Sequence, residues 1–342
     1  MMNLTKRLVV SAIALSLSAT VVQAQTVLRF SDYGPNRGTR AEALEWFADQ
    51  LSERTGGAVT MEFYWGGSLL GGRDTLGGIA SGVADIGTVV GFFTPRELAL
   101  YTIGDLPFEN SDIQSGMRAM YDLSSQNEQI AAEFGAAGVR YLTNYSTGPV
   151  ELICRTEVAS LDALDGLKVR ASGPYGDTLQ RLGAEIVSMS QADVYQALDS
   201  GLIDCNQNYY YAMRAYRQYE VAPHVLELNW GQNLSFGIFI NPASFDALSA
   251  EHQETLTALA SEFVDYLAVG LEAEIDEAKS AMEAGIDGRR VTVTPLSDED
   301  RARLDEVSRD AVGDWLGRTG DAGTEVLSAY EELRAASSAS SR

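Results

Sequence analysis

The sequence predicts an α/β protein of two lobes, which crossing strands and a long helix connect. Strand-like and helix-like segments alternate from residue 26 onward, and this alternation is typical of βα units around a largely parallel sheet. The pattern occurs once in each half of the chain. Residues 250–283 then form an almost unbroken helical pattern, which we expect to span both lobes.

The first half carries the signals of one sheet and its helices. Residues 59–64 alternate between apolar and polar side chains, as a half-buried strand does. Ala43, Phe47 and Leu51 share one face of an amphipathic helix, and several glycines between residues 66 and 72 mark a loop. We expect strands at residues 26–33, 59–64, 84–90 and 139–144, and helices at 39–55, 73–81 and 111–134.

The second half repeats this pattern. Gly201 follows a helical segment and suits the left-handed residue that often ends a helix. We expect strands at residues 152–154, 167–169, 185–187, 202–205, 225–228 and 235–240, and helices at 176–182, 193–200, 211–219 and 250–283. The expected division is a first domain of residues 25–147 and 235–274, and a second of 148–234 and 275–333. Residues 334–342 have low complexity, and we expect this tail to be disordered.

The N-terminus has the pattern of a secretory signal peptide. Lys6 and Arg7 form a charged region, residues 8–22 are apolar or small, and Val22-Gln23-Ala24 fits a cleavage site. A membrane anchor is the alternative, but the apolar segment is short for a span and contains several Ser and Thr residues. We therefore expect removal of residues 1–24 and export, to the periplasm in a Gram-negative source.

The net charge and the two cysteines indicate which partners and which compartment the protein can have. The formal net charge is −23, and it becomes −25 once the two cations Lys6 and Arg7 are removed with the signal peptide. Nucleic acid is therefore excluded as a partner. Cys154 and Cys205 each end an apolar strand-like segment, and an oxidising compartment would allow a disulfide between them. The sequence leaves that bond open, because it does not give the Cα separation.

The stretch from residue 160 to 208 carries the candidate site. It places Arg170 at the end of a short strand, and Asp204 and Asn208 at the end of a second one. A cation at the carboxyl end of a strand, faced by an amide from a neighbouring strand, can hold a small anion at the edge of an open α/β sheet. We therefore expect an anion site here.

The same stretch resembles a known family. Leu164 to Arg170 reads LDGLKVR, and the block from Leu182 to Asn208 ends in LIDCNQN. These motifs, with DLPF at Asp105 to Phe108 and the segment that ends in GVADIG at residue 87, are similar to solute-binding proteins of TRAP transporters (tripartite ATP-independent periplasmic transporters, DctP type). The resemblance covers essentially the whole mature chain. It implies the bilobal periplasmic-binding-protein fold, with a hinge of crossing strands.

The resemblance implies a role for three residues. Arg170 matches the arginine that pairs with the ligand carboxylate, a task that suits the two parallel donors of a guanidinium. Asn208 matches the amide of the family's GQEN block, which can donate to and accept from a ligand. Trp230 falls where members of the family place a ligand-facing side chain, and core packing is the alternative.

Other candidates have two interpretations each. Arg155 lies near the expected hinge and would either reach the ligand or brace the crossing strand. Trp65, Tyr33 and Asp32 lie at strand ends in the first lobe, where they would either face the cleft or pack within their loops. We carry Arg155, Trp65 and Tyr33 forward as candidate ligand contacts.

The end of the motif departs from the family pattern. Cys205 replaces a glycine, Gln207 replaces a glutamate, and Tyr209 replaces the proline that usually follows the asparagine. Three adjacent tyrosines cannot all point one way. We expect one or two of them at the site, with Tyr210 or Tyr211 ahead of Tyr209.

The expected ligand is a monoanion with an apolar or ring-shaped remainder. Aromatic residues are abundant near Arg170. Some sialic-acid-type members of the family carry a second arginine just upstream of the LDGLKVR block, but residues 147–154 here read TGPVELIC, with Val150 and no arginine before Arg155. This argues against sialic acid. The sequence leaves open which acid binds and whether a metal bridges it.

The predicted function is capture of a small organic carboxylate and delivery to TRAP membrane permease subunits, in a system driven by an ion gradient. We expect a monomer without a cofactor. A ligand-sensing protein with the same fold is the alternative. An enzyme is disfavoured, because His224 and His252 lie in no triad or HExxH context and no GxSxG motif occurs.

Overall fold

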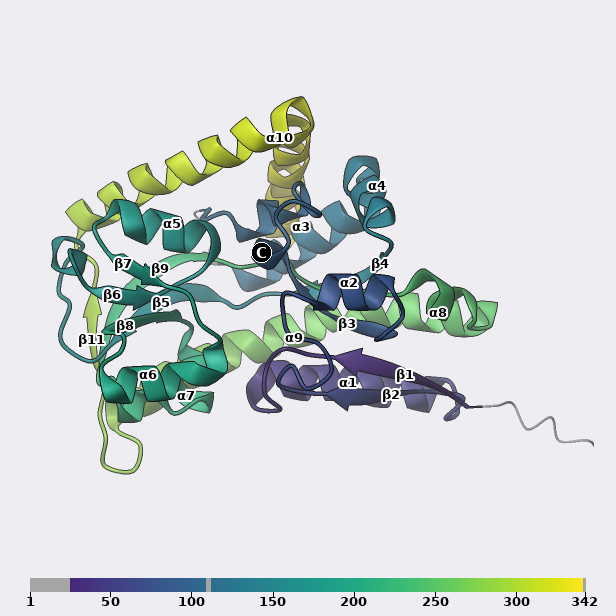
Figure 1. Ribbon diagram of the computed structural model, residues 1–342, viewed down its shortest axis with the longest axis horizontal. Coiled ribbons are helices and arrows are strands. Elements are labelled where there is room, and N and C mark those ends of the chain that lie inside the picture. Colours follow the sequence, from purple (N-terminus) through teal and green to yellow (C-terminus); the bar gives the residue numbers. More distant parts are fainter. Residues whose placement is uncertain (1–24, 109–111, 341–342) are drawn as a thin grey trace, which may run out of the picture.

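The computed structural model describes residues 25–108 and 112–340, and the predicted signal peptide lies outside them. Two sheets form the framework (Figure 1). The first has the order β2-β1-β3-β10-β4, and the second the order β11-β9-β5-β8-β6-β7. This arrangement confirms the expected fold class. No helix in the described part of the chain is long and apolar enough to cross a membrane.

The first sheet combines parallel strands with one that returns from the second half of the chain. Its strands are β1 (Thr26–Ser31), β2 (Val59–Tyr64), β3 (Ile86–Val90), β4 (Arg140–Tyr145) and β10 (Phe236–Ile240). β1 runs parallel to β2 and β3, whereas β10 is antiparallel to β3 and β4. Helices α1 (Gly38–Arg54), α2 (Thr75–Ala80), α3 (Ile113–Gln126), α4 (Glu128–Ala136) and α8 (Pro242–Asp246) accompany it.

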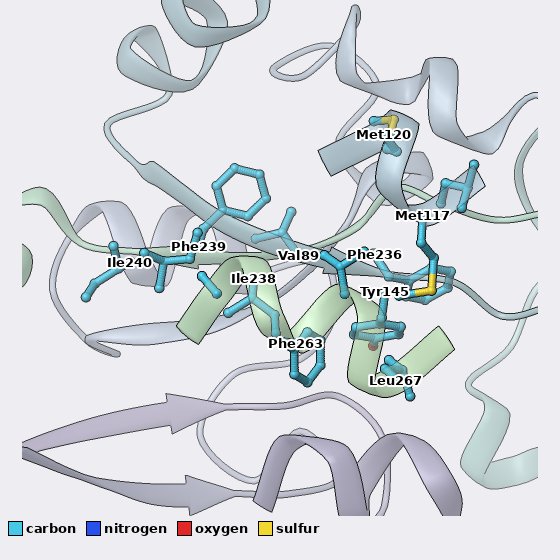
Figure 2. Packing of buried hydrophobic residues seen from close by; sticks show 14 of the residues in the cluster. Val89, Met117, Met120, Tyr145, Phe236, Ile238, Phe239, Ile240, Phe263 and Leu267 are labelled. Carbon is cyan, nitrogen blue, oxygen red and sulfur yellow. The ribbon is translucent and has the colours of Figure 1, made fainter. Parts of the chain in front are cut away.

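The core of the first lobe lies on both sides of this sheet. Figure 2 shows Met117 and Met120 of α3 on one side of β10, and Phe263 and Leu267 of the long helix α9 on the other. These side chains are almost completely buried. Their packing removes a large apolar area from water, the main favourable term in folding.

The second sheet brings together the strands of the candidate site. They are β5 (Pro149–Cys154), β6 (Lys168–Arg170), β7 (Glu185–Val187), β8 (Cys205–Asn208), β9 (His224–Gln232) and β11 (Thr292–Pro295). β6 is parallel to β7 and β8, and β5 is antiparallel to β8 and β9. Helices α5 (Gly173–Arg181), α6 (Val194–Ser200) and α7 (Tyr210–Ala215) connect the strands.

A disulfide lies within the second sheet. Cys154 of β5 and Cys205 of β8 are directly opposite in the antiparallel pair, with Cα atoms 4.1 Å apart, and their sulfurs are bonded. Both side chains are buried in the second core. The sequence left this pairing open, and strand register decides it.

Two extended segments of the chain cross between the lobes. The chain leaves the first sheet after Tyr145 to enter β5, and it returns from Gln232 to β10. The two crossing segments lie together, because the backbone N–H of Thr147 donates to the carbonyl of Asn233 at 3.2 Å, and the N–H of Asn233 donates to the Thr147 hydroxyl at 3.1 Å. These contacts place the hinge beside the carboxyl end of β8.

Two long helices span both lobes (Figure 1). α9 (Ala250–Ala284) packs Phe263 into the first core and Met282 into a core of the second lobe. α10 (Asp298–Ser340) bends at Gly320, whose φ of 61° is left-handed. Leu304 of α10 packs in the second lobe, whereas Trp315 packs in the first core.

Several local predictions need correction. The end of α10 packs on the first lobe, whereas the sequence predicts residues up to 333 in the second domain. The tail from residue 334 is helical as far as Ser340 instead of disordered, because it continues a helix anchored by packed Leu333. The helix expected at 111–134 breaks at Asn127, whose side chain caps α4 by accepting from Gln129 and Ile130 N–H groups. The strand expected at 202–205 forms instead at Cys205–Asn208.

Candidate functional site

Arg170 ends β6 at the boundary between the lobes. It lies opposite Asn206 in the parallel pair of β6 and β8. Its side chain is half-buried, and its Nε donates to the carbonyl oxygen of Met189 at 3.2 Å. The two terminal guanidinium nitrogens make no hydrogen bond within the described residues. They are therefore free to bind an anion in a bidentate manner.

No carboxylate neutralises Arg170 within the described part of the chain. Burial lowers the pKa of Arg170, and the nearby Tyr209 and Tyr33 offset only part of that effect. Arg40 shows the contrasting case. It is also buried, but Asp32 accepts from it at 2.7 Å, and Asp32 together with the nearby tyrosines outweighs the effect of burial and raises the pKa of Arg40. A partly buried charge without a counter-charge costs free energy, and a bound anion would supply that counter-charge.

The first lobe presents aromatic rings toward this region. Phe92 approaches the start of α5 so closely that a Cβ on Gly173 would lie 2.9 Å from its Cβ. The Phe92 ring meets Phe236 edge-on at 5.9 Å between centroids, and Phe236 stacks on Tyr145 at 5.2 Å. Tyr33 lies 6.0 Å from Phe236. These rings form an aromatic cluster in the first lobe, and its member Phe92 lies beside the start of α5.

The three adjacent tyrosines do not all point in the same direction, and Tyr209 is the one that interacts with Arg170. Tyr209 and Tyr211 are stacked with their ring centroids 6.1 Å apart. Tyr209 interacts electrostatically with Arg170, and Tyr211 with Tyr33. Tyr210 instead donates its hydroxyl to Glu227 at 2.9 Å. Of the two tyrosines expected ahead of Tyr209, Tyr210 turns into the second lobe, because α7 begins at this residue, whereas Tyr211 stays beside Tyr209.

Asn208 is the last residue of β8 and is buried. It lies on the same face of the strand as Asn206, since residues two apart share a face. Both side-chain amides donate to Oε1 of Gln218, Asn208 at 2.7 Å and Asn206 at 3.1 Å. Gln218 thus fixes the amide of Asn208 on the face that carries Arg170.

Trp230 packs in the second core. Its indole N–H donates to the hydroxyl of Ser308 at 2.9 Å, and its ring meets Tyr175 edge-on at 4.7 Å. Only 2% of the residue is exposed. Trp230 is therefore a core residue, which is the alternative role that the sequence allows for it.

Arg155 lies at the wrong end of its strand for a ligand contact. Its backbone N–H donates to the carbonyl of Asp204, at the start of β8, whereas Asn208 ends that strand. Its guanidinium lies over Gly201, where a Cβ would approach Nη1 to 2.8 Å. The sequence placed Arg155 near the hinge, but β5 runs antiparallel to β8 and carries it away from the crossing.

Trp65 and Asp32 belong to a structural cluster around Arg40. The guanidinium of Arg40 lies 5.6 Å from the Trp65 ring and 5.9 Å from that of Tyr33. Asp32 accepts from Arg40 and from the Thr88 hydroxyl at 2.8 Å. Asp32 therefore holds the loop that carries Tyr33. No group of three or more possible metal ligands occurs among the described residues.

Sequence reasoning missed Phe92, Phe236 and the leading place of Tyr209. The two phenylalanines lie far apart in the chain and meet only because β10 returns to pair with β3. The sequence places Tyr209 behind Tyr210 and Tyr211 as a ligand contact. Its place in the chain, between the end of β8 and the start of α7, was the available signal.

Comparison with known proteins identifies the family. The family model of the bacterial extracellular solute-binding proteins, family 7 (DctP), matches residues 30–316. The chain belongs to this family. The C4-dicarboxylate-binding periplasmic protein DctP of Rhodobacter capsulatus is 25% identical to it over 300 residues, 87% of this chain and 88% of that protein. Related proteins are thus solute-binding proteins of TRAP transporters.

Solved structures agree with this family assignment. A TRAP periplasmic solute-binding protein from Desulfovibrio salexigens has a TM-score of 0.78 at 26% identity and covers 91% of this chain and 96% of its own. A relative from Bordetella bronchiseptica, with bound (R)- and (S)-mandelate, has a TM-score of 0.81 at 20% identity and covers 91% and 98%. The family members are binding proteins for transport and not enzymes.

Proposed function

We propose that this protein binds a small organic carboxylate with a ring-shaped or apolar remainder and delivers it to the membrane permease subunits of its TRAP system. The observation that carries the proposal is Arg170, a half-buried cation with two unused donors and no acidic partner in the described residues. A carboxylate supplies the matching charge and two acceptor oxygens in one plane.

The surroundings of Arg170 support the expected shape of the ligand. Phe92 lies beside the start of α5, and the buried rings of Phe236 and Tyr145 behind it make this side of the first lobe aromatic. Solved relatives hold mandelate, orotic acid or pyroglutamic acid, each a carboxylic acid with a ring. Export before binding follows from the predicted signal peptide and from the periplasmic location of relatives.

A thermal-shift screen of the chain from Gln25 onward tests the proposal. The panel contains mandelate, orotate, pyroglutamate, succinate and ectoine. A ligand present at a hundredfold excess over Kd stabilises the native state by about 2.7 kcal/mol, which raises Tm by several degrees. Arg170→Ala should lose the shift, whereas Arg155→Ala removes the same charge from the far end of β5 and should keep it.

The screen can contradict the proposal in two ways. If no compound of the panel shifts the wild type, the proposed ligand class is wrong. If Arg170→Ala responds to an acid as strongly as the wild type does, Arg170 is structural and the proposed site is elsewhere.

A further inference from the structure

Tyr209 lies at the candidate site and contacts both lobes. It lies between the end of β8 and the start of α7, and its half-buried ring packs against both the first and the second core. The family pattern has proline at this position, and proline has no hydroxyl. A contact made by the hydroxyl would therefore be particular to this chain.

The hydroxyl of Tyr209 is held by the hinge. Nδ2 of Asn233 donates to it at 2.7 Å. Asn233 lies in the segment between β9 and β10, and it also bonds through its backbone to Thr147 on the other crossing segment. Tyr209 is thereby attached to both segments that must bend when the lobes move.

The chemistry of this contact leaves one proton available. Because the amide of Asn233 supplies the hydrogen in its bond to Tyr209, the phenol keeps its own O–H, which the Thr147 hydroxyl or an anion on Arg170 can accept. Burial raises the pKa of Tyr209, which outweighs the opposing influence of Thr147, Asn233 and Arg170 and keeps the phenol protonated at neutral pH. A protonated phenol within electrostatic range of the Arg170 guanidinium offers a second donor to the same anion.

We propose that Tyr209 is a specificity-determining ligand contact that donates to the carboxylate held by Arg170, with Asn233 as its positioning residue. This inference rests on the proposed function, since it concerns the same site. The bond to Asn233 connects the bound ligand to both crossing segments. The ligand then interacts better with the closed than with the open arrangement, and that difference favours closure.

Calorimetric titration with (R)-mandelate, repeated with orotate and pyroglutamate, tests the ligand contact. Tyr209→Phe removes the hydroxyl and keeps the ring, and we expect its Kd to rise roughly ten- to hundredfold, the usual effect of one hydrogen bond to a charged group. The matched control is Tyr195→Phe on α6. It removes a hydroxyl that donates to Glu220 at 2.9 Å. Its Kd should equal that of the wild type.

A double-variant cycle tests the role of Asn233. Asn233→Ala should weaken binding, and the variant with both Asn233→Ala and Tyr209→Phe should bind no more weakly than Tyr209→Phe alone. Additive losses would mean that Asn233 acts independently of Tyr209, which overturns its role as a positioning residue. Far-UV circular dichroism checks that each variant is folded.

The outcomes separate this inference from the proposed function. A wild type that binds one of the three acids, with Tyr209→Phe unchanged in Kd, overturns the role of Tyr209 and leaves the proposed function in place. A wild type that binds none of them overturns the proposed function, and the role of Tyr209 with it.

Discussion

Glu151 should make the stability of the protein depend on pH. It lies in β5 beside the hinge, and its side chain is fully buried. One oxygen accepts from the backbone N–H groups of Leu228 and Asn229, the latter at 3.0 Å, while the other has no partner among the described residues. Burial raises the pKa of Glu151 to about 8, against the opposing effect of these N–H groups. Glu151 is therefore protonated in the folded protein at neutral pH.

The direction of the pH effect follows from this raised pKa. An unfolded glutamic acid ionises near pH 4.3, so between that pH and about 8 the folded state holds a proton that the unfolded state has released. The stabilising contribution of Glu151 is complete below the unfolded pKa and is lost as pH rises through the folded pKa. One proton changes the free energy of unfolding by about 1.4 kcal/mol per pH unit.

Glu151→Gln removes this ionisation and keeps an acceptor for the two N–H groups. Between pH 5 and pH 8 the free energy of unfolding should fall with rising pH in the wild type. Its slope should exceed that of the variant by about 1.4 kcal/mol per pH unit, the effect of one proton. Urea unfolding at several pH values measures both slopes, and Glu185→Gln, an exposed site on β7, is the control. Parallel pH profiles for wild type and Glu151→Gln would refute the reasoning.

Two further predictions concern the second lobe. Replacing Cys154 and Cys205 together by serine should cost about 4 kcal/mol of stability, because their bond closes a loop over a sequence separation of 51, and an unchanged Tm under oxidising conditions would contradict this. Trp230→Phe loses the bond to Ser308 and some core volume. It should lower the free energy of urea unfolding by about 2 kcal/mol. Its Kd for the ligand should not change. A tenfold higher Kd would indicate that Trp230 contacts the ligand.

Local pattern predicted much of the fold. The strands expected at residues 59–64 and 185–187 are β2 and β7 with the same bounds, because alternation and short apolar runs are properties of the segment itself. The helix expected at 250–283 is α9 to within one residue. The break at Asn127 was missed, since an asparagine cap competes with helix continuation through a side-chain bond that periodicity does not reveal.

The site depended more on strand direction and register. Arg170 was placed at a strand end by its motif, and the structure puts it there. Arg155 was misplaced because the sequence does not say that β5 runs antiparallel to β8. Tyr210 was misplaced because the start of α7 decides which of three adjacent tyrosines turns inward.

The most direct measurement compares an acid with its amide. Calorimetric titration of the acid with the largest thermal shift, and of its primary amide, is made on the wild type and on Arg170→Ala. Removing one partner of a buried charge pair costs roughly 2–5 kcal/mol, so the wild type should prefer the acid by about a hundredfold or more. Arg170→Ala should bind acid and amide with similar, weak affinity. A variant that keeps the preference of the wild type would contradict the role of Arg170 as the carboxylate-binding residue.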